Sequence, residues 1–174
     1  MDDTDLRDLY KRLCDAPSDI RDHLPRLVEI AVDVDASHII ELGVRHGVST
    51  IAWLYAVAVT GGRLTSIDCS APPFLDAPRW TFLFADDLHP NTVAAMEPCD
   101  VLFIDTVHTL EHTRAELAAY GPLVRQGGRI VLHDTMLAID EDQPVLRAMS
   151  EYADARGYEW TNNPRCGGLG EIWT

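Results

Sequence analysis

Five short apolar segments of the sequence each end in one or two ionisable side chains. These end residues are Glu41, Asp68, Asp86 with Asp87, Asp105, and His133 with Asp134. In an open sheet of parallel strands, the carboxyl ends of the strands face one crevice where ligands bind. Because a buried carboxylate must find a partner or be neutralised, a purely structural sheet would not need a charged group at every strand end. The pattern predicts one polar site at this edge.

A histidine near the fourth strand end is a candidate catalytic base. His108 follows Asp105 by three residues and lies at the start of a predicted helix. A neutral imidazole, whose pKa is ordinarily about 6.5, can remove a proton from a hydroxyl group near neutral pH. This position favours His108 as a general base, with a structural histidine as the alternative. His112, one helical turn further on, is interpreted as a supporting or solvent-facing residue.

The segment 39–50 (IIELGVRHGVST) combines an apolar strand, a turn with two glycines and the start of a helix. Such a turn brings main-chain N–H groups close to a ligand, and Gly43 and Gly47 lack the side chains that would block the approach. The dinucleotide fingerprint G-x-G-x-x-G is absent, because Arg45 stands at its second glycine position. The segment predicts a ligand-binding loop of another kind, with an ordinary strand-to-helix turn as the alternative.

The composition indicates one domain and excludes several classes of partner. The 174 residues (19.4 kDa) suffice for one well-buried domain, and a formal charge of -14 argues against binding to nucleic acid or to an anionic membrane surface. The four cysteines have no C-x-x-C spacing, which argues against a zinc knuckle. The sequence shows no signal-peptide pattern and no apolar run of the roughly 20 residues that span a bilayer. We therefore expect a cytoplasmic protein with free thiols.

Strands and helices alternate along the chain. Hydrophobic periodicity and glycine or proline punctuation predict strands at 38–42, 63–68, 80–84, 100–105 and 129–133. The same signals predict helices at 5–14, 20–34, 48–59, 91–96, 109–124 and 143–156, an irregular loop at 71–73 and Pro78, and a hairpin of strands at 158–161 and 169–173. This alternation indicates a single α/β domain with a doubly wound, mostly parallel sheet and helices on both faces.

Three further segments carry a family resemblance. They are F-I-D-x-x-H-T-x-E-H at 103–112, Y-x-P-L-V-x-x-G-G at 120–128 and H-D-T at 133–135. Together with the acidic residue before G-x-x-x-G at 41–47, they closely resemble class I S-adenosylmethionine (SAM) dependent O-methyltransferases of the catechol, macrocin and cephalosporin-hydroxylase-like groups, the last of these most of all. The resemblance implies a Rossmann-like, seven-stranded sheet with a C-terminal antiparallel hairpin. It also implies N-terminal helices at 1–35 as a candidate lid on a SAM-binding core at 36–174.

The resemblance implies which residues contact SAM. Asp68 would accept hydrogen bonds from the ribose hydroxyls, and Asp86 from the adenine amino group, with loop caps as the alternative for both. Arg45 and Ser49 would meet the carboxylate of the amino-acid tail, with a solvated side chain as the alternative for Arg45, and an acidic Glu41 suits the cationic sulfonium. The complete expected cofactor-binding set is Glu41, Gly43, Arg45, Gly47, Ser49, Asp68, Asp86 and Asp105.

In the relatives that the chain resembles, a divalent cation is held by an acidic residue ending the fourth strand and an acidic pair ending the fifth. Asp105 and Asp134 match these positions, whereas His133 replaces the first carboxylate of the pair. Mg²⁺ and Ca²⁺ prefer oxygen ligands, and an imidazole suits Mn, Fe or Zn better. His133 is therefore expected either to bind a softer metal or to act on protons as a second catalytic residue. Polar strand ends without a metal, and a metal-free enzyme, are the alternatives.

The resulting prediction is a SAM-dependent O-methyltransferase that acts on a hydroxyl group of a small molecule, such as a sugar or a polyketide. A divalent cation (Mg²⁺, Mn²⁺ or Ca²⁺) would assist it. The chain is short for this group, which favours a homodimer in which a second subunit completes the pocket. The alternatives are a SAM-binding accessory protein without catalysis and a NAD-linked oxidoreductase, against which Arg45 argues.

Overall fold

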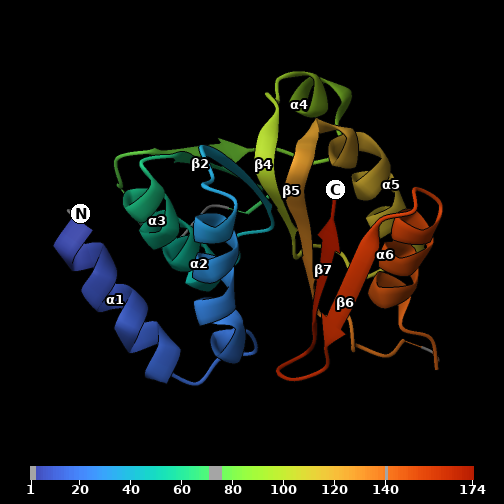
Figure 1. The fold of residues 1–174 in the computed structure, drawn as a ribbon, viewed down its shortest axis with the longest axis horizontal. Coiled ribbons are helices and arrows are strands. Elements are labelled where there is room, and N and C mark those ends of the chain that lie inside the picture. Colours follow the sequence, from blue (N-terminus) through green and yellow to red (C-terminus); the bar gives the residue numbers. More distant parts are fainter. Residues whose placement is uncertain (1–2, 71–75, 140) are drawn as a thin grey trace.

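The computed structural model describes residues 3–70, 76–139 and 141–174, within which seven strands form one sheet (Figure 1). The strands are β1 (His38–Leu42), β2 (Arg63–Asp68), β3 (Trp80–Phe84), β4 (Cys99–Ile104), β5 (Val124–His133), β6 (Glu159–Asn163) and β7 (Leu169–Trp173). Their order across the sheet is β3-β2-β1-β4-β5-β7-β6, and β7 is antiparallel to both of its neighbours. The predicted doubly wound, mostly parallel sheet with an antiparallel hairpin is confirmed.

Helices cover both faces of this sheet (Figure 1). The helices of one face are α1 (Asp3–Asp15), α2 (Leu24–Asp33) and α3 (Val48–Thr60), and those of the other are α4 (Pro90–Ala94), α5 (Leu110–Tyr120) and α6 (Pro144–Asp154). A short 3-10 turn precedes α2, at Arg21–His23, so the helix expected at 20–34 is shorter than predicted.

Successive residues of the central strands point to opposite faces of the sheet. In β1, Ile39 is buried with the side chains of α1 to α3, whereas Ile40 and Leu42 are buried with those of α5 and α6. β4 repeats the pattern, with Phe103 on the first face and Leu102 on the second. Burial of a side chain of this size contributes about 1.5–3 kcal/mol. Because both faces are covered, these strands are apolar throughout and do not alternate with polar residues.

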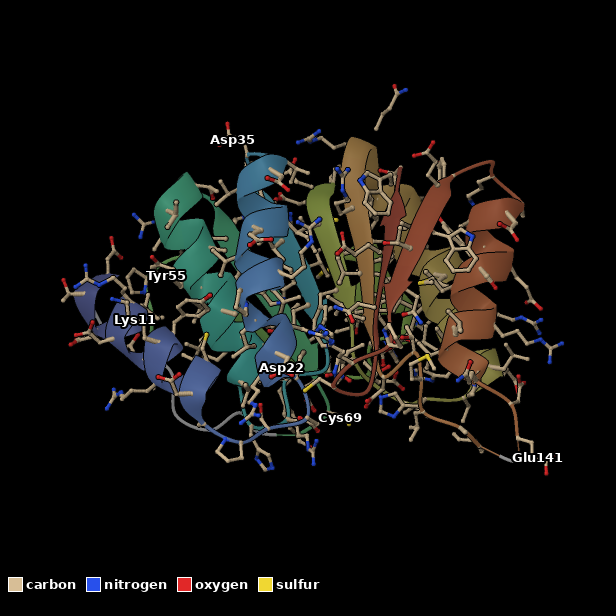
Figure 2. All side chains as sticks on the ribbon, turned by 60° about the horizontal axis from the view of Figure 1, so that its bottom comes forward. Lys11, Asp22, Asp35, Tyr55, Cys69 and Glu141 are labelled. Atoms are coloured by element: carbon tan, nitrogen blue, oxygen red, sulfur yellow. The ribbon has the colours of Figure 1, made fainter. Side chains whose placement is uncertain are left out.

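The strand order reverses beside β1. The chain runs outward from β1 through β2 to β3 and then crosses to β4 on the other side of β1, which places a ligand crevice outside the carboxyl ends of β1 and β4. Gly43 lies here with φ +88°, and a Cβ atom on it would be 2.0 Å from the main-chain oxygen of Asp105. Glycine therefore lets the loop after β1 approach β4. Figure 2 shows Cys69, after β2, and Glu141, after β5, at this end of the molecule, with Asp35, before β1, at the other.

The boundary between α5 and β5 differs most from the prediction. The helix expected at 109–124 ends at Tyr120, and β5 begins at Val124, five residues before the predicted start at 129. The prediction is wrong here because two adjacent glycines, Gly127 and Gly128, are typical of the end of a helix. They lie inside the strand, Gly127 with φ +79°, where the pairing of β5 with β4 shifts register.

Three other expectations concern the whole chain. The predicted irregular loop at 71–73 lies outside the described residues, and Pro78 is in a turn. All four cysteines, Cys14, Cys69, Cys99 and Cys166, are free thiols, as expected. Among the helices that the structure describes, none has the length and apolar character needed to cross a bilayer.

Candidate functional site

A pocket of about 530 Å³ opens at the carboxyl ends of the strands. This volume suits a small-molecule ligand. Its wall is built from the segments that follow five successive strands, β1 to β5. The lining residues are Gly43, Val44, Arg45, Ile67, Asp68, Cys69, Ser70, Asp87, Asp105, Thr106, Val107, His108 and Asp134. The strand ends therefore converge on one pocket, as the sequence pattern predicts.

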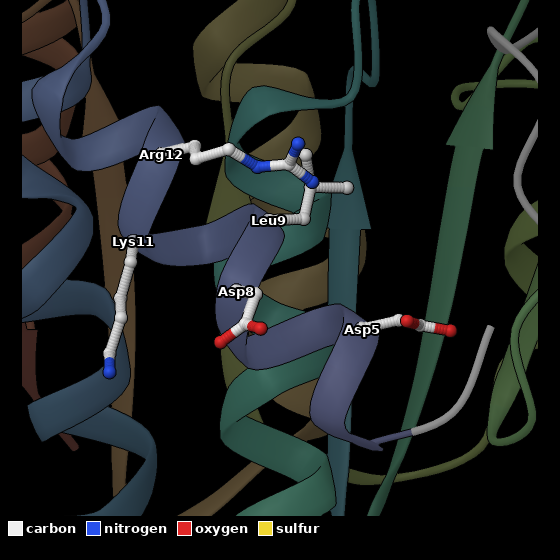
Figure 3. A pocket seen from close by; sticks show the side chains of 5 residues that line it. All are labelled: Asp5, Asp8, Leu9, Lys11 and Arg12. Carbon is white, nitrogen blue, oxygen red and sulfur yellow. The ribbon is translucent and has the colours of Figure 1, made fainter.

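A second hollow lies on the surface of α1 (Figure 3). The residues that line it are Asp5, Asp8, Leu9, Lys11 and Arg12, all from this one helix. In Figure 3 the side chains of Lys11 and Arg12 extend in different directions. Side chains that diverge from a single helix do not converge on a ligand, so the pocket at the strand ends is the candidate site.

Asp68 ties the glycine loop to the end of β2. Its Oδ2 accepts hydrogen bonds from the N–H groups of Val44 (2.8 Å) and Arg45 (2.9 Å), and its Oδ1 accepts one from the N–H of Ser70 (2.7 Å). Burial opposes ionisation, but these donors lower the pKa of Asp68. A carboxylate has about four acceptor positions, so roughly one is left for a ligand. Asp68 lines the pocket as predicted, but with room for fewer ribose hydrogen bonds than the two expected.

Glu41 lies behind the pocket, fully buried between β1, β2 and α3. The hydroxyl groups of Ser49 (2.7 Å), Thr50 (2.9 Å) and Ser66 (2.6 Å) all donate to its carboxylate. Burial raises the pKa of Glu41 to about 7, although these three donors act in the opposite direction. Neither Glu41 nor Ser49 is among the described residues that line the pocket. The predicted cofactor contacts of these two side chains are corrected accordingly, because each already has its partner inside the protein.

The other residues of the glycine loop act through the main chain. Arg45 lines the pocket, but its guanidinium is mostly exposed and already lies 2.7 Å from the carboxylate of Asp19. Gly47 caps the start of α3 with φ +75° and is not one of the lining residues among those described. His46, in the same loop, is exposed. The loop therefore offers backbone more than side chains to a ligand.

After β3, the adjacent aspartates have different positions. Asp86 is exposed, and its Oδ1 accepts a hydrogen bond from the N–H of Leu88 (2.9 Å), which is the loop-cap role that was the alternative. Asp87 lines the pocket instead. Asp86 is not among the described residues that line the pocket, so its predicted contact with adenine is not supported, and Asp87 is the neighbouring carboxylate that reaches the pocket.

Two carboxylates and two imidazoles meet at the ends of β4 and β5. We call Asp105, His108, His133 and Asp134 the acceptor cluster. The Nε2 of His108 lies 3.4 Å from Asp105 and 3.2 Å from Asp134. The Nδ1 of His133 lies 3.5 Å from Asp105 and 3.6 Å from Asp134. The structure thus brings together all four residues that the sequence proposed as catalytic or metal-binding at this position.

His133 is held in one orientation from behind. Its ring is 1% exposed, and Nε2 lies 3.0 Å from the carbonyl oxygen of Cys166 in the turn between β6 and β7. A carbonyl only accepts, so Nε2 carries the hydrogen atom and donates it. Nδ1 is buried and has no hydrogen-bond partner among residues 3–70, 76–139 and 141–174. A metal-binding histidine shows this arrangement, in which the nitrogen opposite the metal donates to a fixed acceptor.

The charges in the acceptor cluster stabilise one another. Burial opposes ionisation of Asp105, but the imidazoles of His108 and His133 hold its pKa at about 2. The hydrogen bond with Asp105 raises the pKa of His108. Burial raises the pKa of Asp134, whose φ of +54° is uncommon for a residue other than glycine. Such backbone strain often accompanies functional positions.

A second group of ionisable residues adjoins the pocket and was not predicted. We call Asp87, His112 and Glu116 the α5 cluster. The Nε2 of His112 lies 3.2 Å from Asp87 and 3.6 Å from Glu116, and the hydroxyl of Thr106 donates to Glu116 (2.5 Å). Burial raises the pKa of Glu116 to about 9. The sequence signal was the four-residue spacing of His112 and Glu116, which places both on one face of a helix.

Solved structures share the fold of this chain at low sequence identity. The SAH-bound methyltransferase PaMTH1 from Podospora anserina is 13% identical, with a TM-score of 0.65 over 97% of this chain and 86% of that chain. Cofactor-bound Rv0187 from MTB is 17% identical, with a TM-score of 0.68 over 97% of this chain and 88% of that chain. The methyltransferase MycE of the mycinamycin biosynthetic pathway, in complex with Mg, SAH and mycinamycin VI, is 18% identical, with a TM-score of 0.70 over 86% of this chain and 48% of its own.

Sequence comparison places the chain in a family. No curated protein sequence matches it significantly. Residues 40–135, from β1 through the end of β5, match a family described as a methyltransferase domain. This match covers more than half of the chain, including the glycine loop and the acceptor cluster. The chain therefore belongs to this family of methyltransferase domains, as the resemblance of its sequence motifs implies.

Proposed function

We propose that the protein transfers the methyl group of SAM to a hydroxyl oxygen of a small acceptor molecule, with the help of a divalent cation. The observation that carries this proposal is the acceptor cluster, which stands beside the pocket formed by the glycine loop and Asp68. Methyl transfer to oxygen needs alignment of two substrates and removal of a hydroxyl proton. The pocket supplies the first, and the cluster supplies groups for the second.

The cofactor's place follows from the lining residues. Asp68 keeps roughly one acceptor position for a ribose hydroxyl, and Asp87 presents a carboxylate toward the expected position of adenine. Gly43 keeps the loop after β1 free of a side chain, so the amino-acid tail of SAM can lie against main-chain atoms. The methyl group would then point toward the ends of β4 and β5.

The acceptor cluster fits a divalent cation. Asp105 and Asp134 would hold it through oxygen and His133 through Nδ1, the buried nitrogen that has no partner among the described residues. One nitrogen with two oxygens favours Mn²⁺ over Mg²⁺ or Ca²⁺, because an imidazole is a softer ligand than a carboxylate. When bound, such a cation lowers the pKa of a coordinated hydroxyl group.

His108 is the proposed general base. Its Nε2 faces the two carboxylates, so Nε2 carries a hydrogen atom and Nδ1 is the nitrogen that accepts a proton from the acceptor hydroxyl. Asp105 and Asp134 orient the ring and stabilise the imidazolium that forms. The side chain is about a quarter exposed, which leaves the ring accessible from the pocket.

The identity of the acceptor is proposed as a class. The resemblance of the three sequence motifs to the cephalosporin-hydroxylase-like and macrocin-like O-methyltransferases supports a hydroxyl group of a sugar, a polyketide or another natural product as the acceptor. MycE, a structural neighbour, was solved with Mg and with mycinamycin VI. A homodimer that completes the acceptor side of the pocket stays a prediction from chain length.

Two measurements test the proposal. Calorimetric titration with SAM, SAH and NAD should show binding of the first two only, and NAD binding alone would support the oxidoreductase alternative. Methyl transfer from labelled SAM to a panel of sugars, polyketides and catechols, with Mn²⁺ present, should give a labelled ether product. SAM binding without transfer to any member of the panel would favour an accessory protein.

A further inference from the structure

We propose that the α5 cluster is a second divalent-cation site, which binds Zn²⁺ or an ion of similar preference through Asp87, His112 and Glu116. This site shares no ligand with the acceptor cluster. It does not depend on the proposed methyl transfer.

The spacing of the three ligand atoms fits one ion. The Nε2 of His112 is 3.2 Å from Asp87 Oδ2 and 3.6 Å from Glu116 Oε1, and all three ligand atoms lie within 4.8 Å of one another. A four-coordinate zinc ion with bonds of about 2.0–2.1 Å separates its ligand atoms by roughly 3.3 Å. The three atoms can therefore share an ion with little movement of the side chains.

A buried oxygen supplies a second observation. Glu116 is fully buried, and its Oε1 accepts from the hydroxyl of Thr106. Its Oε2 has no hydrogen-bond partner within the part of the chain that the structure describes. A buried carboxylate oxygen without a partner is unfavourable, and a cation that both carboxylate oxygens of Glu116 contact, together with His112 and Asp87, would satisfy it.

The fold holds the ligands in place. His112 and Glu116 stand one helical turn apart on α5, a spacing at which two side chains of a helix can bind the same metal ion. Asp87 follows β3, and its main-chain oxygen accepts a hydrogen bond from the hydroxyl of Tyr120 (2.5 Å) near the end of the same helix. A bound ion would therefore fasten the segment after β3 to α5.

The donor set selects the kind of ion. One imidazole and two carboxylates form a nitrogen–oxygen set that suits Zn²⁺ better than the all-oxygen preference of Mg²⁺ or Ca²⁺. Three protein ligands leave a position for water. Because Asp87 also lines the pocket, an ion here would add positive charge beside the expected position of adenine.

The test counts Zn²⁺ in a protein whose acceptor cluster cannot hold it. The double variant Asp105→Asn with Asp134→Asn removes the carboxylates of that cluster, and equilibrium dialysis followed by metal analysis gives the Zn²⁺ bound per chain. We expect this variant to retain one equivalent. Adding His112→Gln or Glu116→Gln should remove it, whereas adding Glu111→Gln should not. Glu111 is an exposed carboxylate on the same helix and outside the cluster.

Thermal unfolding provides an independent readout. Because an ion that binds only the folded state stabilises it, Zn²⁺ should raise the melting temperature of the double variant and of its Glu111→Gln form, but not of its His112→Gln form. Circular dichroism shows whether each variant is folded. If Glu116→Gln does not fold, His112→Gln alone tests whether the α5 cluster binds Zn²⁺. The proposal is overturned if the double variant binds no Zn²⁺, which would mean that Asp87 and Glu116 share only a proton. It is also overturned if His112→Gln leaves the bound Zn²⁺ unchanged.

Discussion

The Nδ1 atom of His133 faces a carboxylate oxygen of Asp105 at 3.5 Å, while the other nitrogen of the same ring donates to the carbonyl of Cys166. In the neutral ring this arrangement points a lone pair at an anion. The contact becomes favourable when a positive charge lies between them, either a metal ion or a proton on Nδ1. The geometry of this pair therefore makes His133 the most direct test of the metal in the acceptor cluster.

Replacing His133 by asparagine should weaken Mn²⁺ binding by at least about 10-fold. Removal of a residue that only orients a metal ligand typically lowers metal affinity by about 10–100-fold, and the loss of a ligand itself should cost no less. Titration calorimetry with Mn²⁺ gives the affinity. His46→Asn serves as the control, because His46 is exposed and outside the acceptor cluster. Equal Mn²⁺ affinity in the wild type and in His133→Asn would assign His133 to proton transfer or to structure.

Replacing Asp68 by asparagine should lower the affinity for SAH by roughly 10-fold or more, since one charge-assisted hydrogen bond contributes about 1.5–3 kcal/mol. The variant also weakens the anchor for the N–H groups of Val44 and Arg45, which adds to the loss. Asp86→Asn is the matched control, because Asp86 is a loop cap outside the pocket lining of the described chain. If Asp86→Asn lost more affinity than Asp68→Asn, the assignment of the cofactor pocket would be wrong.

Replacing His108 by asparagine should slow the chemical step by roughly 10²–10⁴-fold, which is the usual contribution of a positioned base. Asparagine keeps a polar side chain of similar reach without the basic nitrogen. The affinity for SAH should change little, because His108 faces the acceptor side of the pocket. Single-turnover methyl transfer separates the two quantities, and a near-native rate in His108→Asn would transfer the role of base to His133.

The buried Glu41 should make folding stability depend on pH. Its pKa is about 7 in the folded protein against 4.5 for an ordinary glutamate, so the folded state holds more protons between these values. Stability from this group is complete below about pH 4.5 and is lost as the pH rises through 7. Glu41→Gln cannot ionise, and its stability relative to the wild type should therefore rise by on the order of 3 kcal/mol between pH 4.5 and 8.

Urea unfolding of the wild type and of Glu41→Gln across this pH range measures that difference. Glu159→Gln is the control, because Glu159 is exposed on β6. Parallel stability curves for Glu41→Gln and the wild type would show that the three hydroxyl donors around Glu41 balance the effect of its burial on the pKa.

Much of the fold follows from local sequence signals. The bounds of β1, β2 and β3 agree with the prediction because each strand is a short run with glycine, proline or aspartate within three residues of its ends. The beginning of β5 could not be predicted in this way. Gly127 and Gly128 are typical of a turn, but their N–H and carbonyl groups pair with Thr174 (2.6 and 3.4 Å), a contact between residues far apart in the sequence.

The site was predictable in position but not in the direction of each side chain. A strand end places a residue at the correct edge of the sheet, yet the sheet alternates its side chains, so Glu41 points to the hydroxyls of α3. Asp86 and Asp87 lie in the loop after β3, where no strand periodicity applies, so position could not distinguish them. The α5 cluster joins residues of two elements, β3–α4 and α5, and only the packed structure shows that Asp87 reaches His112.

The turn between β6 and β7 gives the site an order of assembly. Except for Asp134, all described residues that line the pocket precede β5 in the sequence. The carbonyl group that holds the ring of His133 belongs to Cys166, which follows His133 by 33 positions. Proteins emerge from the ribosome from the N-terminal end, and domains generally fold as units. On a nascent chain that still lacks the β6–β7 turn, the ring of the proposed metal ligand His133 has no carbonyl group of Cys166 to hold it. Catalytic competence is then acquired only when the hairpin has emerged and closed over that ring.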